Sequence, residues 1–432
     1  MIQRIQREID ERCFNLYGID QADRQAMTAG FGTGGGVGEG VEPTGEASAA
    51  DAGGEDEDDD APDGAAGGGD APTFTTELLS WAVGVAFGRF DLRLATGERQ
   101  APPEPDPFDP LPVCSPGMLT GDDGLPPAVP PPGYPIAFPA DGVLTDDPGH
   151  ASDLTARVRE VFGVVFGSQA DARWQEAAEL VAPRGHDLRR WLTREAFGLH
   201  LRAYSKSRRR APIYWQLGTP SGSYSVWLYY HRFSRDTLYT VLNDYVAPKL
   251  RHEERRLTGL VQDAGLQPTP GQRRDIAAQE AFVEELRAFR EELARVAPLW
   301  APDLNDGVII NSAPLWRLLP QHKAWQREVK ACWDKLVSGA YDWAQLAMHL
   351  WPERVLPKCA TDRSLAIAHG LESAFWSEAD DGKWRAREVT DETVHGLIDK
   401  RSSEAVRAAR DSLLSAPSAG IAAKRRAQGG RG

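Results

Sequence analysis

The sequence predicts a mainly α-helical protein that carries one embedded β-hairpin and a long disordered acidic linker. Apolar residues recur at helical spacing over most of the chain, as at Phe282, Leu286 and Phe289. One stretch differs, because apolar and aromatic residues alternate with a period of two on both sides of the turn sequence GTPSGS. The segment 28–72 has no Lys or Arg and almost no large apolar side chain, so it cannot offset its ordering entropy by burial.

The first element is expected to be an amphipathic helix over residues 1–18 that ends at Gly18. A short lone helix needs a partner for its apolar stripe, so we expect it to belong to a larger assembly of elements. The linker 28–72 follows it and carries nearly all of the net charge of −14. Its twelve acidic residues are Glu39, Glu42, Glu46, Asp51, Glu55, Asp56, Glu57, Asp58, Asp59, Asp60, Asp63 and Asp70.

The remaining chain divides by composition. Residues 73–100 have the apolar stripe of a helix, and residues 101–150 are rich in proline and are expected to be irregular. Residues 151–416 are expected to form a helical C-terminal domain that contains the β-hairpin, 211–233. Residues 417–432 are a basic tail.

Several classes of protein are disfavoured by composition. The four cysteines are isolated, without a C-x-x-C pair, and no secretory signal is present at the N-terminus, so we expect a reduced, cytoplasmic protein without a zinc site. The most apolar window, 78–87, is much shorter than the roughly 20 residues that a membrane span needs. We therefore expect a soluble protein with no membrane partner.

Common catalytic motifs are missing from the sequence. It contains no G-x-S-x-G, H-E-x-x-H or G-x-x-x-x-G-K-[ST] pattern. Asp303, Glu328 and Lys330 mimic the residues of a metal-dependent nuclease, but the last two lie on one predicted helix and point in different directions. They are interpreted as surface charges. We assign no catalytic, cofactor-binding or metal-binding residue.

A basic region surrounds the predicted hairpin. Residues 202–256 contain eleven Lys and Arg against four Asp and Glu, so their balance is +7 in an acidic protein. Phosphate binding is one use of such a cluster, and arginines that stack on the protein's own aromatic rings are the alternative. Outward-facing aromatics of the hairpin could stack on bases. The candidate DNA-contacting residues are Lys206, Arg208, Arg209, Arg210, Trp227, Tyr229, His231, Arg232 and Arg235.

Several long motifs resemble a known family. They are, in chain order, EIDERCFNLYGI, LLSWAVGVAFGRFDL, RRRAPIYWQLGTP, WLYYHRFSRDTLYTVLNDYVAPKL and a tail that includes HKAWQREVKACWDKLVSGAYDWAQLAMHLWPERVLPKC. They resemble the C-terminal region of large adenine-specific DNA methyltransferases of the BREX and DISARM phage-defence systems and of Eco57I-type restriction-modification enzymes. The resemblance spans most of the chain apart from the acidic linker.

The resemblance implies a part of such an enzyme without its reaction centre. The family holds a flipped adenine with an N-P-P-Y motif and binds S-adenosylmethionine with a glycine-rich loop. The sequence contains no N-P-P-Y motif. Its glycine run at 30–36 lies between a predicted helix and the linker, whereas a glycine-rich cofactor loop lies between a strand and a helix. We therefore expect no activity or cofactor in this chain alone, and double-stranded DNA plus the catalytic half or another defence protein as partners. The alternative is an interaction scaffold that does not touch DNA.

Overall fold

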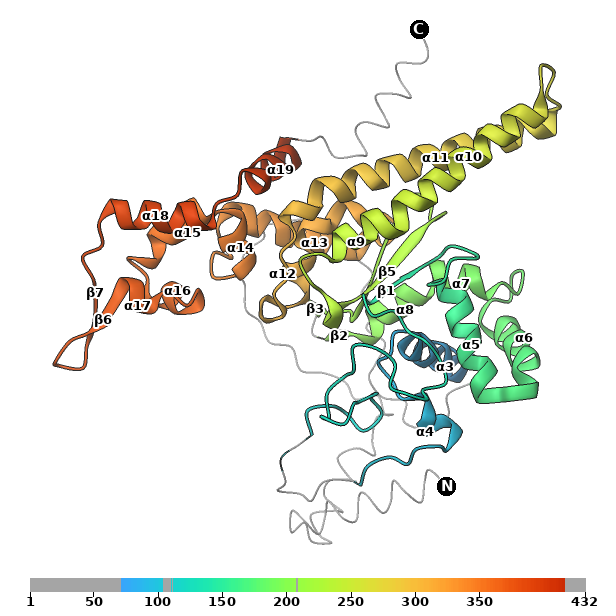
Figure 1. Ribbon diagram of the computed structural model, residues 1–432, viewed down its shortest axis with the longest axis horizontal. Coiled ribbons are helices and arrows are strands. Elements are labelled where there is room, and N and C mark those ends of the chain that lie inside the picture. The colour runs from blue at the N-terminus through green and yellow to red at the C-terminus, as the bar shows by residue number, and fades with distance from the viewer. Residues whose placement is uncertain (1–70, 104–109, 111, 207–208, 416–432) are drawn as a thin grey trace, which may run out of the picture. The chain divides into compact units, whose positions relative to one another are not determined.

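A computed structural model describes residues 71–103, 110, 112–206 and 209–415 (Figure 1). In this part the protein is mainly helical, with short strands that include the hairpin, which confirms the predicted fold class. The predicted helix 1–18 and the basic tail 417–432 lie outside the described residues. So does the linker except for its last two residues, which already belong to the first described helix.

The helix predicted over 73–100 is two helices in the structure, α3 (Ala71–Ala86) and α4 (Leu92–Thr96). Gly88 has a φ of +72°, and a Cβ at this position would lie 2.6 Å from a packed aromatic ring. This left-handed conformation favours glycine and ends α3. Asp91 then caps α4 by accepting a hydrogen bond from the backbone N–H two residues further on, at 3.1 Å.

A group of four helices follows, and α3 packs against the first two of them. The segment 188–203 is interrupted at Glu195 and forms two helices. The four are α5 (Leu154–Phe166), α6 (Ala170–Val181), α7 (Leu188–Arg194) and α8 (Ala196–Ala203).

The hairpin is part of a three-stranded antiparallel sheet with the strand order β1-β5-β4. Its strands are β1 (Val143–Thr145), β4 (Tyr214–Gly218) and β5 (Ser225–Tyr229), and Leu144 pairs with Trp227. β1 lies in the segment 101–150 that was expected to be irregular, and this expectation is wrong at these residues. Every residue of the three strands is buried, so both faces of the sheet belong to the core.

Helices cover each face of this sheet. On one face, Phe87 after α3 stacks on Tyr214 with 4.8 Å between the ring centroids, and a phenylalanine of α8 contacts Trp227. On the other face, Trp215 contacts Trp300, with the ring centroids 6.4 Å apart. The sheet therefore forms the middle layer of three.

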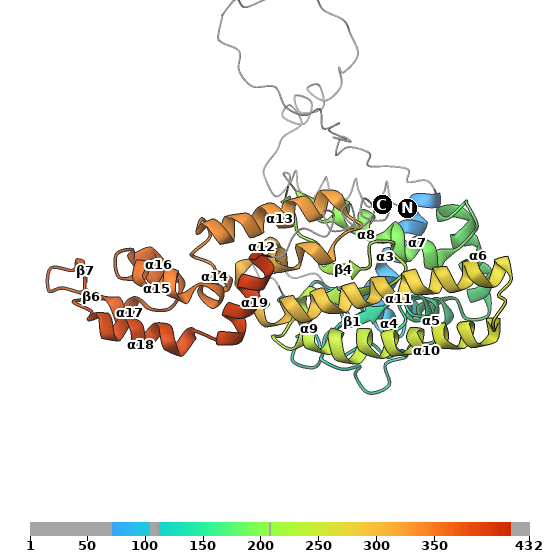
Figure 2. The same ribbon diagram turned by 90° about the horizontal axis from the view of Figure 1, so that it is seen from above.

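Two long helices form the second helical layer (Figure 2). They are α10 (Ala247–Ala264) and α11 (Pro270–Val296), which run side by side, and α11 begins with a capping box made by Thr269 and Gln272. The short α9 (Thr237–Thr240) and the π-helical turn Val241–Val246 lead from the sheet into α10.

The C-terminal part consists of shorter helices and one small hairpin. Its last two helices are separated by two serines, and the hairpin β6–β7 was not predicted. α19 returns to α11. The elements are α12 (Val308–Ser312), α13 (Lys323–Ser338), α14 (Gln345–Leu350), α15 (Pro352–Cys359), α16 (Arg363–Ala368), α17 (Glu372–Phe375), β6 (Trp376–Glu378), β7 (Trp384–Ala386), α18 (Asp391–Arg401) and α19 (Glu404–Ser415).

Candidate nucleic-acid interface

The open end of the hairpin brings two predicted basic segments together. β4 begins where β5 ends, because Tyr214 pairs with Tyr229 and the Tyr230 N–H donates to the Ile213 carbonyl at 2.8 Å. The chain before β4 and the chain after β5 therefore leave the sheet at the same end. Cationic residues that are separated by about twenty positions in the sequence reach one region of the fold in this way.

The basic run before β4 forms a second small hairpin, β2 (Ser205–Lys206) and β3 (Arg209–Arg210). Arg208 and the side chains of Lys206 and Arg209 lie outside the described part of the structure. The Arg210 guanidinium donates to the Glu328 carboxylate of α13 at 2.8 Å, and the Arg210 side chain remains 37% exposed. One predicted contact residue is thus partly engaged by a carboxylate that the sequence did not connect with it.

The segment after β5 contributes His231, Arg232 and Arg235. Arg232 donates through Nη2 to the Pro127 carbonyl and packs against Gly142, where a Cβ would lie 2.5 Å from the Arg232 Cβ. His231 and Arg235 are exposed. Arg232 is therefore held by the fold, whereas Arg235 presents its charge to solvent.

Arg89, in the turn after α3, joins this region although sequence reasoning missed it. Its Nη1 donates to the Tyr204 hydroxyl at 2.7 Å, and its guanidinium lies 4.7 Å from the centroid of the Phe90 ring. Partial desolvation and the Arg89 charge lower the pKa of His231. A single arginine far from the basic run carries no sequence signal, so only the fold reveals that Arg89 adds a positive charge here.

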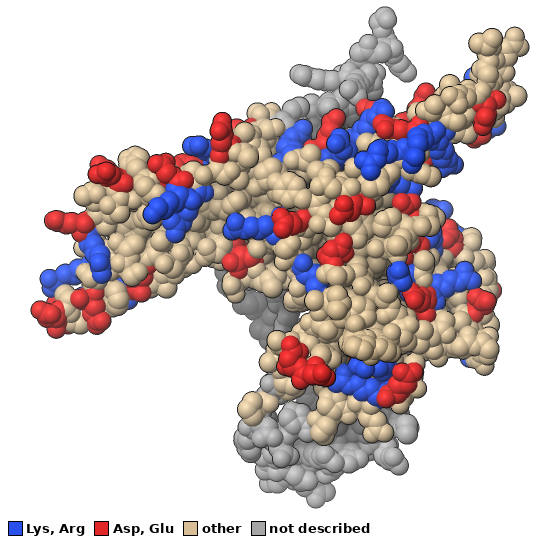
Figure 3. Space-filling model, viewed as in Figure 1, with Lys and Arg blue, Asp and Glu red and all other residues tan. Residues whose placement is uncertain are grey.

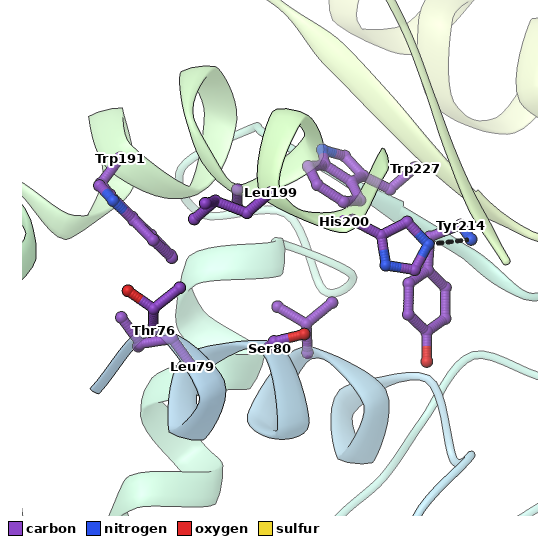
Figure 4. Close-up of a pocket in the computed structure, with 10 residues that line it drawn as sticks. Thr76, Leu79, Ser80, Trp191, Leu199, His200, Tyr214 and Trp227 are labelled. Atoms are coloured by element: carbon purple, nitrogen blue, oxygen red, sulfur yellow. Dashed lines mark hydrogen bonds between the residues drawn. The ribbon is translucent and has the colours of Figure 1, made fainter. Parts of the chain in front are cut away.

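Trp227 and Tyr229 were expected on an outward face of the hairpin, and this expectation is wrong. Trp227 is 1% exposed and Tyr229 is 2% exposed. Figure 4 shows Trp227, Tyr214 and His200 above α3, around a cavity of about 20 Å³ that holds little more than one water molecule. Because α3, distant in sequence, covers this face, no nucleobase can reach these rings.

Buried His200 and half-buried His322 stabilise the strands from this side. His200 Nε2 accepts hydrogen bonds from the Ile213 N–H at 3.0 Å and from the Tyr214 N–H at 3.1 Å. Burial, together with the Arg89 charge, lowers the pKa of His200 to about 3. His322 donates to the Gln216 side-chain carbonyl at 2.8 Å, and burial lowers its pKa to about 4. Both rings are neutral at neutral pH and have a structural role.

A second group of cations lies on α10. Arg251, Arg255 and Arg256 are exposed there, and Figure 3 shows Lys and Arg gathered along this helix with acids between them. Lys249 of the same helix has only 11% of its side chain exposed and is paired with two carboxylates, at 2.6 and 2.8 Å. Figure 2 places α10 and α13 on opposite sides of the sheet. The basic residues of 202–256 therefore form two surfaces rather than one.

The described residues offer no metal site or membrane-spanning helix. They contain no group of three or more His, Cys, Asp or Glu side chains that could hold a metal ion. None of the helices in the described ranges has the length and apolarity needed to cross a membrane. Cys114, Cys332 and Cys359 are buried free thiols.

Comparison with known proteins relates the chain to a methyltransferase. No protein-family model matches it. Over 185 residues, which make up 40% of this chain, it is 29% identical to the adenine-specific methyltransferase PglX of Lacticaseibacillus casei (strain Zhang). The chain spans only 15% of the length of that relative. The similarity supports a methyltransferase-related origin.

Proposed function

We propose that the chain is the non-catalytic C-terminal part of an adenine-specific DNA methyltransferase of a phage-defence system of the BREX, DISARM or restriction-modification type. The similarity to PglX supports the relationship to such enzymes. The motifs quoted above, in their order along the chain, support the position within the enzyme. Since the sequence contains no N-P-P-Y motif, the adenine and S-adenosylmethionine would be bound by a catalytic part outside these residues.

The role proposed for this part is to hold double-stranded DNA by its phosphates and to support the catalytic part. The cationic open end of the hairpin carries this proposal, because phosphate neutralisation supplies most sequence-independent affinity for DNA. Trp227 and Tyr229 take no part, since the core encloses them. The proposed contacts are Lys206, Arg208, Arg209, Arg210, His231, Arg232 and Arg235.

The test removes three of these charges together. We expect Arg208→Ala, Arg209→Ala and Arg210→Ala in one variant to weaken binding to duplexes of any sequence. The plot of log binding constant against log salt should become shallower by about two to three units, because each phosphate contact contributes about 0.9. Fluorescence anisotropy of a labelled duplex over a salt series measures both quantities. An unchanged slope rejects the assignment.

A matched control removes the same charge elsewhere. Arg251, Arg255 and Arg256 on α10 are also three exposed arginines, but acidic side chains lie among them (Figure 3). Replacing these three by alanine should change the slope by less than one unit. The single variant Glu328→Gln breaks the ion pair but keeps Arg210. It should lower the thermal midpoint without making the salt slope shallower, which separates the ion pair from the phosphate contact.

A protein-interaction scaffold is the second candidate function. It is favoured by large apolar side chains that are exposed in the C-terminal part, among them Ile367 (51%) and Trp384 (37%). Under this function the arginines would face acids of a partner protein. Absence of any duplex binding in a gel shift at low salt, together with stable co-purification with the catalytic part, would favour it.

A further inference from the structure

An open pocket of about 600 Å³ lies beside β3, between the start of α12, one face of α13 and the segment that follows α13. Figure 1 shows these elements next to one another. Val308, Ile309 and Cys332 form an apolar floor, and Tyr341 and Trp343 also line the pocket. The volume lies in the range of small-molecule sites, roughly 300–1,000 Å³.

The aromatic wall is exposed but held in place. Trp343 is 46% exposed and meets Tyr341 with 5.9 Å between the ring centroids. Between them, Asp342 is only 5% exposed and accepts from Arg354 and Lys358, each at 2.6 Å. Two ion pairs to this buried carboxylate therefore fix the backbone that presents Trp343. A large apolar ring that is already held outward loses little conformational entropy when a planar ligand stacks on it.

Backbone contacts after Trp343 strengthen this support. Both carboxylate oxygens of Asp306 accept hydrogen bonds, from the Gln345 N–H and the Leu346 N–H, each at 2.8 Å. The start of α14 is thereby tied to the pocket floor.

Four charged side chains line the pocket. Arg210 and Lys335 are the cations, and Asp306 and Glu328, which pairs with Arg210, are the carboxylates. The Lys335 ammonium lies 5.5 Å from the centroid of the Tyr341 ring and donates to the Tyr341 hydroxyl at 3.4 Å, so it stands at the edge of the aromatic wall. A cation beside an aromatic wall fits a planar base with a phosphate next to it.

We propose that this pocket takes one unpaired nucleobase, stacked on Trp343, while the flanking phosphates lie near Arg210 and Lys335. The inference rests on the proposed DNA-binding function, because Arg210 belongs to both surfaces. It adds a preference for unpaired over paired DNA that phosphate contacts alone do not provide.

The test compares a labelled single strand of thymines with a blunt duplex of equal length, by fluorescence anisotropy with the full chain. Trp343→Ala should weaken single-strand binding about tenfold, because stacking of one base on one ring is worth that much. Duplex binding should change less than twofold. Trp343→Phe keeps a stacking surface and should retain most of the single-strand affinity. In a strand with a central 2-aminopurine, stacking on the ring should quench the fluorescence of that base. This quenching should be lost only in the Trp343→Ala variant.

Trp384→Ala is the matched control, because Trp384 is the other tryptophan among the exposed large apolar side chains. The Arg363 guanidinium carbon lies 4.0 Å from the centroid of the Trp384 ring. It should change neither affinity. The inference is overturned if Trp343→Ala leaves single-strand binding intact, if it weakens both forms of DNA equally, or if Trp384→Ala has the same effect. If the unaltered chain binds neither single-stranded nor duplex DNA, the proposed function is rejected as well. If the chain binds duplex DNA with the expected salt slope, the proposed function stands even when this inference fails.

Discussion

His200 and His322 show how single residues that are withdrawn from solvent in the fold, fully or in part, set the response of the sheet to acid. Each has a pKa lowered by burial, to about 3 and about 4 respectively. In the unfolded chain a histidine has a pKa of about 6.5. Below that pH the unfolded state binds protons that the folded state excludes, so the free energy of unfolding is highest above pH 6.5 and decreases as the pH approaches the folded values.

The corresponding prediction concerns His322→Gln, because glutamine cannot titrate but can still donate to Gln216. In the parent chain, lowering the pH from 7 to 5 should cost about 2 kcal/mol per buried histidine. The variant should lose about 2 kcal/mol less over the same interval. Urea unfolding at the two pH values, followed by tryptophan fluorescence, measures the difference. The exposed His395→Gln is the control, and an equal effect there would contradict the prediction.

At the scale of elements, the turn into β1 links the sheet to the candidate interface. Gly142 has a φ of +68°, and its N–H donates to the Pro139 carbonyl at 3.1 Å. A Cβ on Gly142 would lie 2.5 Å from the Cβ of Arg232. The close approach of this turn to Arg232 therefore depends on the absence of a side chain.

We predict that Gly142→Ala destabilises the protein by about 2–4 kcal/mol, through backbone strain of about 1 kcal/mol and a clash of about 1–3 kcal/mol. Gly149→Ala should cost only about 1 kcal/mol, because Gly149 has a φ of +87° but nothing within 4 Å of an added Cβ. The difference between the two thermal or urea midpoints isolates the clash. Equal losses would show that Arg232 moves away freely.

Periodicity predicted the elements better than it predicted their surroundings. The helical stripe of α11 and the alternation in β4 and β5 were readable, because each depends on local spacing. The burial of Trp227 was not readable, since apolar residues on both faces of a strand do not tell which helix covers which face. β1 was missed because three residues in a proline-rich segment carry no period.

At the scale of the whole molecule, the described residues belong to one compact unit. Its candidate interface could be predicted only in part. The basic run and the residues after β5 were readable from charge, and the fold places their backbones at one end of the sheet. Arg89 and the pocket at Trp343 were not readable, because each is assembled from segments far apart in the sequence.

The proposed division of labour between this chain and a catalytic part predicts its response to S-adenosylmethionine. A ligand at one hundred times its dissociation constant stabilises a folded protein by about 2.7 kcal/mol, so a genuine site would raise the thermal midpoint by several degrees. We expect no shift and no methyl transfer to duplex DNA from this chain alone, because its sequence lacks the N-P-P-Y motif. Adding the catalytic part should restore transfer, and the Arg208→Ala, Arg209→Ala and Arg210→Ala variant should then raise the KM for DNA more than it lowers kcat. A thermal shift with the isolated chain would instead place a cofactor site within these residues and remove the basis for calling this part non-catalytic.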